Sequence, residues 1–227
     1  MVIGTNIYWA LFIIITLASW IASSAVNHRF ERYAKVPVRL TGKEVAEKML
    51  REHGIDDVQV TCTSGHLTDH YNPVTKTINL SESVYSSASI AAAAVAAHEC
   101  GHAVQHAHEY APLKMRSALV PAVQFASSWL TWVILGGILL VGVFPYLLMF
   151  GIGLFGITTL FSFVTLPVEI DASRRAISWL EESGITTRET NEMAVSALKS
   201  AAWTYVVAAL SSLATLVYYI MILLDRR

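Results

Sequence analysis

His98-Glu99-Cys100-Gly101-His102 is the stretch on which the interpretation of the whole sequence depends. It has the form H-E-x-x-H, in which two histidines stand four residues apart. In an α-helix such residues lie on one face about one turn apart, so both imidazoles can reach a single zinc ion. Glu99 follows the first histidine and is placed to take a proton from a zinc-bound water. The pattern predicts a zinc-binding helix with Glu99 as general base.

The residues before this motif favour the helix that it needs. The run from Ala91 to Ala97 consists of alanines and one valine, and alanine has the highest intrinsic helix propensity. Small side chains also indicate a buried helix that its neighbours approach closely, and a buried helix carries polar groups only where they have partners. The alternative is a surface helix with incidental histidines, and these small residues argue against it.

The overall composition bounds the class of protein. Hydrophobic residues make up 54% of the chain and the mean hydropathy is +0.50, which is too apolar for an ordinary soluble domain. The formal net charge of -1 gives no support to nucleic-acid binding. The two cysteines, Cys62 and Cys100, form neither a disulfide framework nor a C-x-x-C zinc site. We interpret both as small buried hydrophobic residues, with Cys100 directed away from the face that the histidines share.

The first apolar segment, residues 7–26, is long enough to cross a bilayer. A cleaved signal peptide would carry basic residues before its apolar core, whereas here they come after it: His28, Arg29, Arg32, Lys35 and Arg39. We therefore interpret the segment as a retained transmembrane anchor of the cell (inner) membrane. The positive-inside rule then places the following residues, and the catalytic site with them, on the cytoplasmic side.

Residues 27–128 are expected to form the catalytic region with the zinc helix. Thr41 to Gly54 has the pattern of an amphipathic helix, with Thr41 and Glu44 as a capping box and Gly54 as the C-terminal stop. Short strands are expected to follow, so that a small sheet precedes the metal helix; they are Val58–Cys62, Leu67–Tyr71 and Thr75–Leu80.

The predicted sheet suggests where a substrate would bind. Zinc peptidases lay the substrate backbone along an edge strand beside the metal helix, and Thr77–Leu80 is the candidate edge strand. Asp69, His70 and Tyr71 form a polar cluster near it, which either clasps a hairpin or contributes to the site. Ser81 is expected to cap a short helix, the zinc helix to begin near Ser89, and Pro112 to end or kink the helix that follows. Another helix is expected over residues 113–128.

The uncharged segment from Ser128 to Val164 is too long for one ordinary span. Gly142-Val143-Phe144-Pro145 breaks it near the middle, so we expect two short spans in a hairpin over residues 129–164. The chain is polar again over residues 165–202, and residues 203–224 form the last apolar span.

The polar region between these spans is expected to be helical. Pro167 is expected to begin its first helix and Gly184 to break it. The run Thr186-Thr187-Arg188-Glu189 then resembles the cap of a second helix through Leu198.

A catalytic zinc takes three protein ligands and keeps one position open, so the two histidines need a third partner. His108 has the spacing of H-E-x-x-H-x-x-G-x-x-H, but Gln105 replaces the glycine at which that helix must end. His106 shares the face of His102 but lies a turn too far along. Glu169 stands just outside an apolar span, where a carboxylate needs a partner, and a later helix can supply a zinc ligand. We favour Glu169, which the membrane hairpin would return to the side of the histidines.

Three segments together resemble the YugP-like membrane zinc metallopeptidases of bacteria: His98–His106, Leu67–Pro73 and Pro167–Ala176. The resemblance covers nearly the whole chain, from the first span to the last. More distantly, the layout is similar to HtpX and the prenyl-protein (CAAX) proteases, which are membrane gluzincins.

The wider group implies a ligand set and a supporting residue. It implies one zinc ion held by His98, His102 and Glu169, with Glu99 as general base. Its glutamate motif also carries an aspartate four residues after the glutamate, which supports an active-site histidine. Here Ser173 stands at that position, and Asp171 faces the other way on a helix.

The predicted function is a zinc-dependent endopeptidase that hydrolyses membrane or membrane-proximal polypeptides. The oxyanion needs a second electrophile besides zinc, and the candidates are His70, Tyr71, Arg174 and Arg175. The alternative is a non-catalytic membrane adaptor or scaffold with a structural zinc that His70 or His106 closes, although such sites are usually rich in thiolates. A transporter is less favoured, because the spans carry no ionisable residue in mid-membrane.

The expected fold class is a mainly α integral membrane protein. It combines about four transmembrane helices with a small zincin-like α+β catalytic region, whose short sheet precedes the metal helix. The expected partners are a polypeptide substrate and the lipid bilayer.

Overall fold

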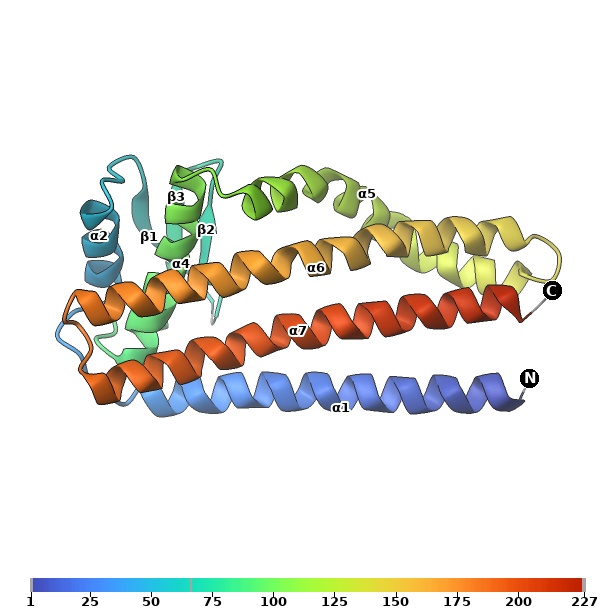
Figure 1. The fold of residues 1–227 in the computed structure, drawn as a ribbon, viewed down its shortest axis with the longest axis horizontal. Coiled ribbons are helices and arrows are strands. Elements are labelled where there is room, and N and C mark those ends of the chain that lie inside the picture. The colour runs from blue at the N-terminus through green and yellow to red at the C-terminus, as the bar shows by residue number, and fades with distance from the viewer. Residues whose placement is uncertain (1, 66, 226–227) are drawn as a thin grey trace. The chain divides into compact units, whose positions relative to one another are not determined.

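The computed structural model describes residues 2–65 and 67–225 and shows a mainly α-helical chain with one small sheet (Figure 1). The elements follow the chain in this order: α1 Val2–Tyr33, α2 Gly42–Glu52, β1 Gln59–Thr63, β2 His70–Asn72, β3 Thr77–Ser81, α3 Glu82–Tyr85, α4 Ile90–Ala107, α5 Ala111–Leu140, α6 Pro145–Glu182 and α7 Arg188–Leu224.

Four of these helices are long and apolar enough to cross a membrane: α5, α6, α7 and the Trp9–Tyr33 part of α1. Large hydrophobic side chains stay exposed on them, such as Trp20 with 66% and Leu139 with 75% of the side chain's surface accessible. A hydrocarbon environment accommodates such a surface, whereas water does not. The expected class, a mainly α membrane protein with about four spanning helices and a small sheet, is confirmed.

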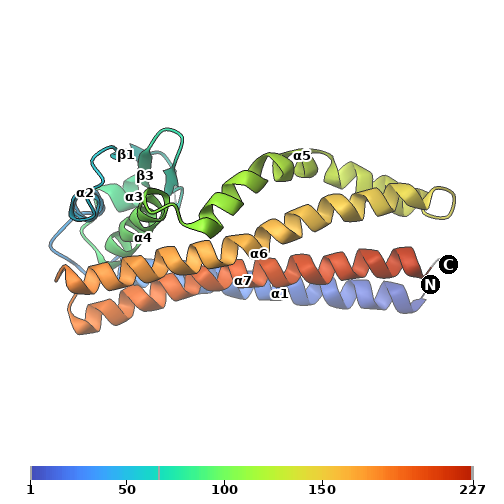
Figure 2. The same ribbon diagram turned by 45° about the horizontal axis from the view of Figure 1, so that its top comes forward.

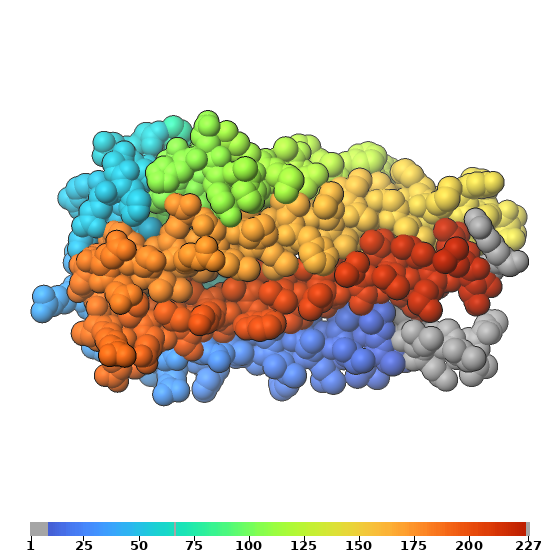
Figure 3. Space-filling view, viewed as in Figure 1, coloured from blue at the N-terminus to red at the C-terminus, as the bar shows by residue number. Residues whose placement is uncertain are grey.

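The predicted break at Gly142-Val143-Phe144-Pro145 separates α5 from α6. Gly137 lets these two helices approach closely, because a Cβ atom there would lie 2.7 Å from the Cα of Leu148. An apolar cluster forms at this end, with α7 side chains packed against it; its buried members are Ile134, Val141 and Leu148. Figure 3 shows α6 and α7 side by side on one face of this part of the chain.

The chain divides into two compact units. The apolar unit comprises residues 1–21, 115–166 and 204–227. The site unit comprises residues 22–114 and 167–203, and it contains the sheet and every residue proposed for the site. Both α6 and α7 are continuous helices that contribute residues to each unit.

In the site unit, β3 is the central strand of the sheet. It pairs in parallel with β1 and antiparallel with β2, and Ile78 and Leu80 on it are fully buried. The expectation that Thr77–Leu80 is an edge strand is therefore wrong. Although β2 precedes β3 in the sequence, it lies at an edge of the sheet. This edge strand contacts α4. Figure 2 shows the strands gathered beside α4.

The helix α2 covers one side of α4. Thr41 and Glu44 form the predicted capping box, and Gly54 follows the helix with a φ of +67°, a conformation that favours glycine. The apolar face of α2 is buried in the same core as the alanines of α4; its residues are Val45, Ala46, Met49 and Leu50. This packing accounts for the small residues that precede the motif.

Prolines mark fewer helix boundaries than expected. Pro112 lies in the first turn of α5, where its missing N–H has no helical partner to lose. Pro167 lies inside α6 rather than at the start of a helix. The helices expected at residues 113–128 and 186–198 are parts of α5 and α7. An interior proline removes one backbone hydrogen bond without ending the helix in every case, and α6 continues through Pro167.

Three smaller expectations have mixed outcomes. Cys100 is buried, with its Sγ 3.5 Å from the Ala46 carbonyl, as predicted, but Cys62 is exposed. Ser81 precedes α3 without capping it, because its hydroxyl donates to the Asp69 carboxylate. Asp69 also accepts the Ser81 backbone N–H at 2.7 Å, so it acts as a clasp between the strands.

Candidate metal centre

The two histidines of the motif stand on one side of α4. Ser89 precedes this helix, and its hydroxyl accepts the Ala92 N–H at 3.3 Å, which satisfies one of the free donors at the helix start. The imidazole rings of His98 and His102 have centroids 4.8 Å apart and planes at 81°. Both side chains are largely buried, with 15% and 10% of their surface exposed. The helical spacing thus brings two ring nitrogens into one small volume.

The helices α4 and α6 meet at Gly101. A Cβ atom at this position would lie 2.6 Å from the Ala172 carbonyl oxygen, a separation that no side chain tolerates. Ala172 comes three residues after Glu169, about one helical turn. Because α4 and α6 approach so closely at Gly101, Glu169 on α6 lies beside the histidines of α4. The H-E-x-x-H pattern places no requirement on the residue at position 101, so it does not predict this packing role.

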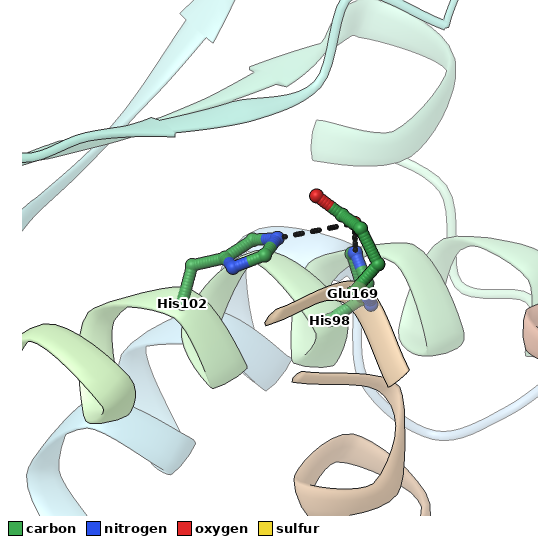
Figure 4. A group of neighbouring side chains, drawn as sticks. All are labelled: His98, His102 and Glu169. Carbon is green, nitrogen blue, oxygen red and sulfur yellow. Dashed lines mark ion pairs between the residues drawn. The ribbon is translucent and has the colours of Figure 1, made fainter. Parts of the chain in front are cut away.

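Glu169 lies against both histidines (Figure 4). Its Oε2 is 3.3 Å from His98 Nε2 and 3.6 Å from His102 Nε2, and one ligand atom from each of the three residues lies within 4.8 Å of the other two. Zinc bonds of about 2.0–2.1 Å at tetrahedral angles would place ligand atoms roughly 3.3 Å apart, and the two distances from Glu169 Oε2 are close to that value. Two imidazoles and one carboxylate are also a donor set found in catalytic zinc sites.

Glu99 lies between α4 and the sheet. Its Oε2 accepts the backbone N–H of Tyr71 at 2.9 Å, and only 8% of Glu99 is exposed. This N–H is directed toward α4 rather than β3, so it belongs to the open edge of β2. The bond orients the carboxylate that follows the first histidine.

The second ring nitrogen of each histidine also has a polar neighbour. The Ser173 hydroxyl lies 3.2 Å from His98 Nδ1, and the Gln105 Oε1 lies 3.1 Å from His102 Nδ1. Such contacts fix the tautomer and orientation of a metal-binding histidine. Ser173 stands at the position where the wider group carries its aspartate, and it contacts His98. The sequence indicates Gln105 only as a residue that continues the helix, and no local pattern predicts its contact with His102.

Asp171 binds Gln105 and Arg175. Its Oδ2 accepts the Gln105 side-chain amide at 2.9 Å and the Arg175 Nε–H at 2.6 Å. Arg175 also lies over the Tyr110 ring, 5.9 Å from its centroid. Arg174, the residue before Arg175 on α6, is exposed. Two arginines were candidates for stabilising the oxyanion, and one of them, Arg175, is thus bound to Asp171.

The remaining candidates lie on the sheet and at the end of α4. His70 has Nδ1 2.8 Å from the Thr68 carbonyl, so it braces the β2 hairpin. The Tyr71 hydroxyl lies 2.9 Å from His106 Nδ1, and His108 is the C-cap of α4. Within residues 2–65 and 67–225, the ligand group holds His98, His102 and Glu169 and none of the other histidines.

Two groups on α4 have shifted pKa values. Burial acts most strongly on His102 and lowers its pKa, but the hydrogen bond to Glu169 and the charges of Glu99 and Glu169 outweigh burial and raise the pKa. Burial, with a smaller contribution from the Glu99 charge, raises the pKa of the Cys100 thiol well above its ordinary value. The Cys100 thiol therefore stays protonated and is a poor metal ligand.

Comparison with known proteins identifies the family of this chain. A family model described as "Putative neutral zinc metallopeptidase" matches residues 8–224. The chain belongs to this family. The zinc metallopeptidase family match runs from the first candidate span to the last, which confirms the resemblance inferred from the motifs.

One relative extends the comparison to a membrane protein. It is "Putative membrane protease YugP" of Bacillus subtilis (strain 168), which is 41% identical over 223 residues, covering 96% of this chain and 98% of the relative. No solved structure matches the chain. The family supports zinc and peptidase chemistry, and the relative supports a membrane setting.

Proposed function

We propose that this chain is a zinc-dependent membrane endopeptidase whose single zinc ion is held by His98, His102 and Glu169. The observation that carries the proposal is the convergence of three ligand-type side chains from α4 and α6, with Glu169 Oε2 3.3 Å and 3.6 Å from the two Nε2 atoms. Membership of a zinc metallopeptidase family supports it.

The proposed chemistry assigns one step to each polar group. Zinc, when bound, supplies a Lewis acid that polarises the scissile carbonyl and acidifies water. Glu99 accepts a proton from the attacking water and donates it to the leaving amine. The Tyr71 N–H bond at 2.9 Å holds Glu99 in place for this transfer. His98 and His102 would hold the metal through their Nε2 atoms, because Ser173 and Gln105 lie against the Nδ1 atoms.

The substrate backbone is proposed to lie along β2. This strand pairs with β3 on one side, and its other side faces α4, where the Tyr71 N–H reaches Glu99. An extended peptide added to an open strand edge gains main-chain hydrogen bonds. Among the four oxyanion candidates, we retain Tyr71, because its backbone contacts Glu99, whereas His70 and Arg175 are bound elsewhere and Arg174 is exposed.

The proposed substrates are membrane or membrane-proximal polypeptides. Glu169 follows Leu166, the last residue of the apolar unit on α6, by only three residues of the same helix. That distance corresponds to roughly 5 Å along a helix axis. A ligand so near the end of an apolar run would act on chains that lie at the membrane surface.

The test uses the full chain in proteoliposomes with a membrane-tethered reporter polypeptide. The Glu99→Gln variant is expected to retain zinc, measured by atomic spectroscopy, and to lose at least about 100-fold in cleavage rate. Glu47→Gln, at an exposed position of α2, is the matched control and should cleave normally. An equally active Glu99→Gln variant would contradict the proposal. Wild-type protein that binds zinc, unfolds on chelation and cleaves nothing would favour the adaptor with a structural zinc.

A further inference from the structure

Gln105 is fully buried at the junction of the two helices that carry the proposed ligands. Its Nε2 donates to the Val168 carbonyl at 2.8 Å and to Asp171 Oδ2 at 2.9 Å, while its Oε1 faces His102 Nδ1 at 3.1 Å. An amide without partners in such a place would destabilise the fold. Every polar atom of this side chain has a partner, and those partners lie on both helices.

The contacts determine which way the amide points. Val168 O and Asp171 Oδ2 are both acceptors, so the end of Gln105 between them must be the NH2 group. The oxygen is then directed at His102, and Nδ1 must carry the proton that it accepts. A neutral imidazole protonated at Nδ1 presents a free lone pair at Nε2, the atom that faces Glu169.

We infer that Gln105 is a positioning residue that holds His102 in the tautomer and orientation required to bind zinc. This inference rests on the proposed function. Asp171 supports Gln105 in turn, and the Arg175 Nε–H holds Asp171 at 2.6 Å. Because Val168 immediately precedes Glu169, the same amide also links the histidine helix to the segment that carries the third ligand.

The experiment measures zinc affinity of the detergent-solubilised full chain by competition with a chromophoric chelator, together with thermal unfolding of the metal-free protein. Gln105→Met keeps the side-chain length and removes the hydrogen bonds. Its zinc affinity is expected to fall about 10- to 100-fold, with a changed visible spectrum of the cobalt-substituted protein. Gln59→Met, the same exchange at an exposed position of β1, should bind zinc like the wild type. A folded Gln105→Met variant with wild-type affinity would overturn the inference.

A second pair of variants tests the positioning role of Gln105 if Gln105→Met does not fold. Gln105→Glu places a carboxylate against Asp171 and the Val168 carbonyl, and should weaken zinc binding. Adding Asp171→Asn supplies an amide donor to that carboxylate and restores the original net charge, so the double variant should recover at least about tenfold in affinity. A double variant no better than Gln105→Glu would also overturn the inference. Wild-type protein that binds no zinc would instead contradict the proposed function.

Discussion

Gly101 is the residue at which one added methyl group would separate the two helices that carry the proposed ligands. Its ideal Cβ position is 2.6 Å from the Ala172 carbonyl oxygen and 3.1 Å from the Ala172 Cα. These are backbone atoms, so no side-chain rotation can relieve the clash. Glycine here sets the distance between α4 and α6 and, through it, the distance between the histidines and Glu169.

Gly101→Ala is therefore expected to weaken both folding and zinc binding. Overpacking of this kind costs about 1–3 kcal/mol, and a displaced Glu169 should lower zinc affinity. Chemical denaturation of the metal-free protein and chelator competition measure the two effects. Gly156→Ala on α6 is the matched control, because nothing lies within 4 Å of the corresponding Cβ position. If Gly101→Ala matched that control in both measurements, the packing argument would be wrong.

Residues of the candidate site differ in how far the sequence could predict them. His98, Glu99 and His102 follow from the helical period alone, since their relation is local. Glu169 could be proposed because a carboxylate beside an apolar span needs a partner. The partners of Gln105, by contrast, are 63 and 66 residues away in the chain, at Val168 and Asp171. Only the packing of α4 on α6 reveals that contact.

At the scale of elements, the open edge of β2 is the feature that the proposed mechanism uses. The Tyr71 N–H is the donor that this edge presents to Glu99, at 2.9 Å. Tyr71→Pro removes that donor without removing a bond to β3, because proline is tolerated where an edge N–H faces outward. The variant is expected to retain zinc and to cleave at least about tenfold more slowly, measured with the tethered reporter.

Tyr71→Phe separates the backbone from the phenol. It keeps the N–H that Glu99 accepts and loses the hydroxyl contact with His106. Cleavage close to wild type by this variant would assign the effect of Tyr71→Pro to the strand edge. A loss as large as that of Tyr71→Pro would instead assign it to the hydroxyl and support the oxyanion role.

The start of the zinc helix gives a second test at this scale. The Ser89 hydroxyl accepts the Ala92 N–H at 3.3 Å within a buried region. Ser89→Ala leaves that donor without its partner, which should lower the free energy of unfolding by about 1 kcal/mol. Ser86→Ala, at an exposed hydroxyl that donates to the Glu82 carbonyl, should change it by less than about 0.5 kcal/mol. Equal effects in a denaturation titration would argue against the cap.

The order and length of elements were only partly predictable. Capping residues and apolar length located α2, α4 and the break between α5 and α6, because these signals are local. The strand order was misjudged, since chain order does not decide which strand becomes central. Pro167 was misjudged as a helix start, because the packing around an interior proline is not visible in its neighbours.

At the scale of the whole molecule, the apolar helices and the polar site unit have opposite surface requirements. The candidate spans expose large hydrophobic side chains, whereas the site unit buries its apolar residues around α4. This contrast follows from composition, since apolar runs long enough to cross a bilayer alternate with charged segments. The side of the membrane on which the site unit lies is predicted from a different feature, the basic residues after the first span.

The natural cysteines can test the proposed cytoplasmic location. Cys62 on β1 is exposed, whereas Cys100 is fully buried and burial raises the pKa of its thiol. A membrane-impermeant maleimide should therefore label Cys62 and not Cys100. With the site unit in the cytoplasm, labelling is expected only after the cells are permeabilised. Labelling of intact cells would place the site unit outside and contradict the orientation.

Two variants make this labelling experiment specific to the site unit. Cys62→Ser should abolish labelling both before and after permeabilisation, because Cys100 is 0% exposed. Val74→Cys in that background introduces a thiol at a loop position that is 91% exposed, between β2 and β3. Since both positions belong to the site unit, they must report the same side of the membrane. Labelling of both positions only after permeabilisation would place the site unit in the cytoplasm, the side that the basic residues after the first span predict.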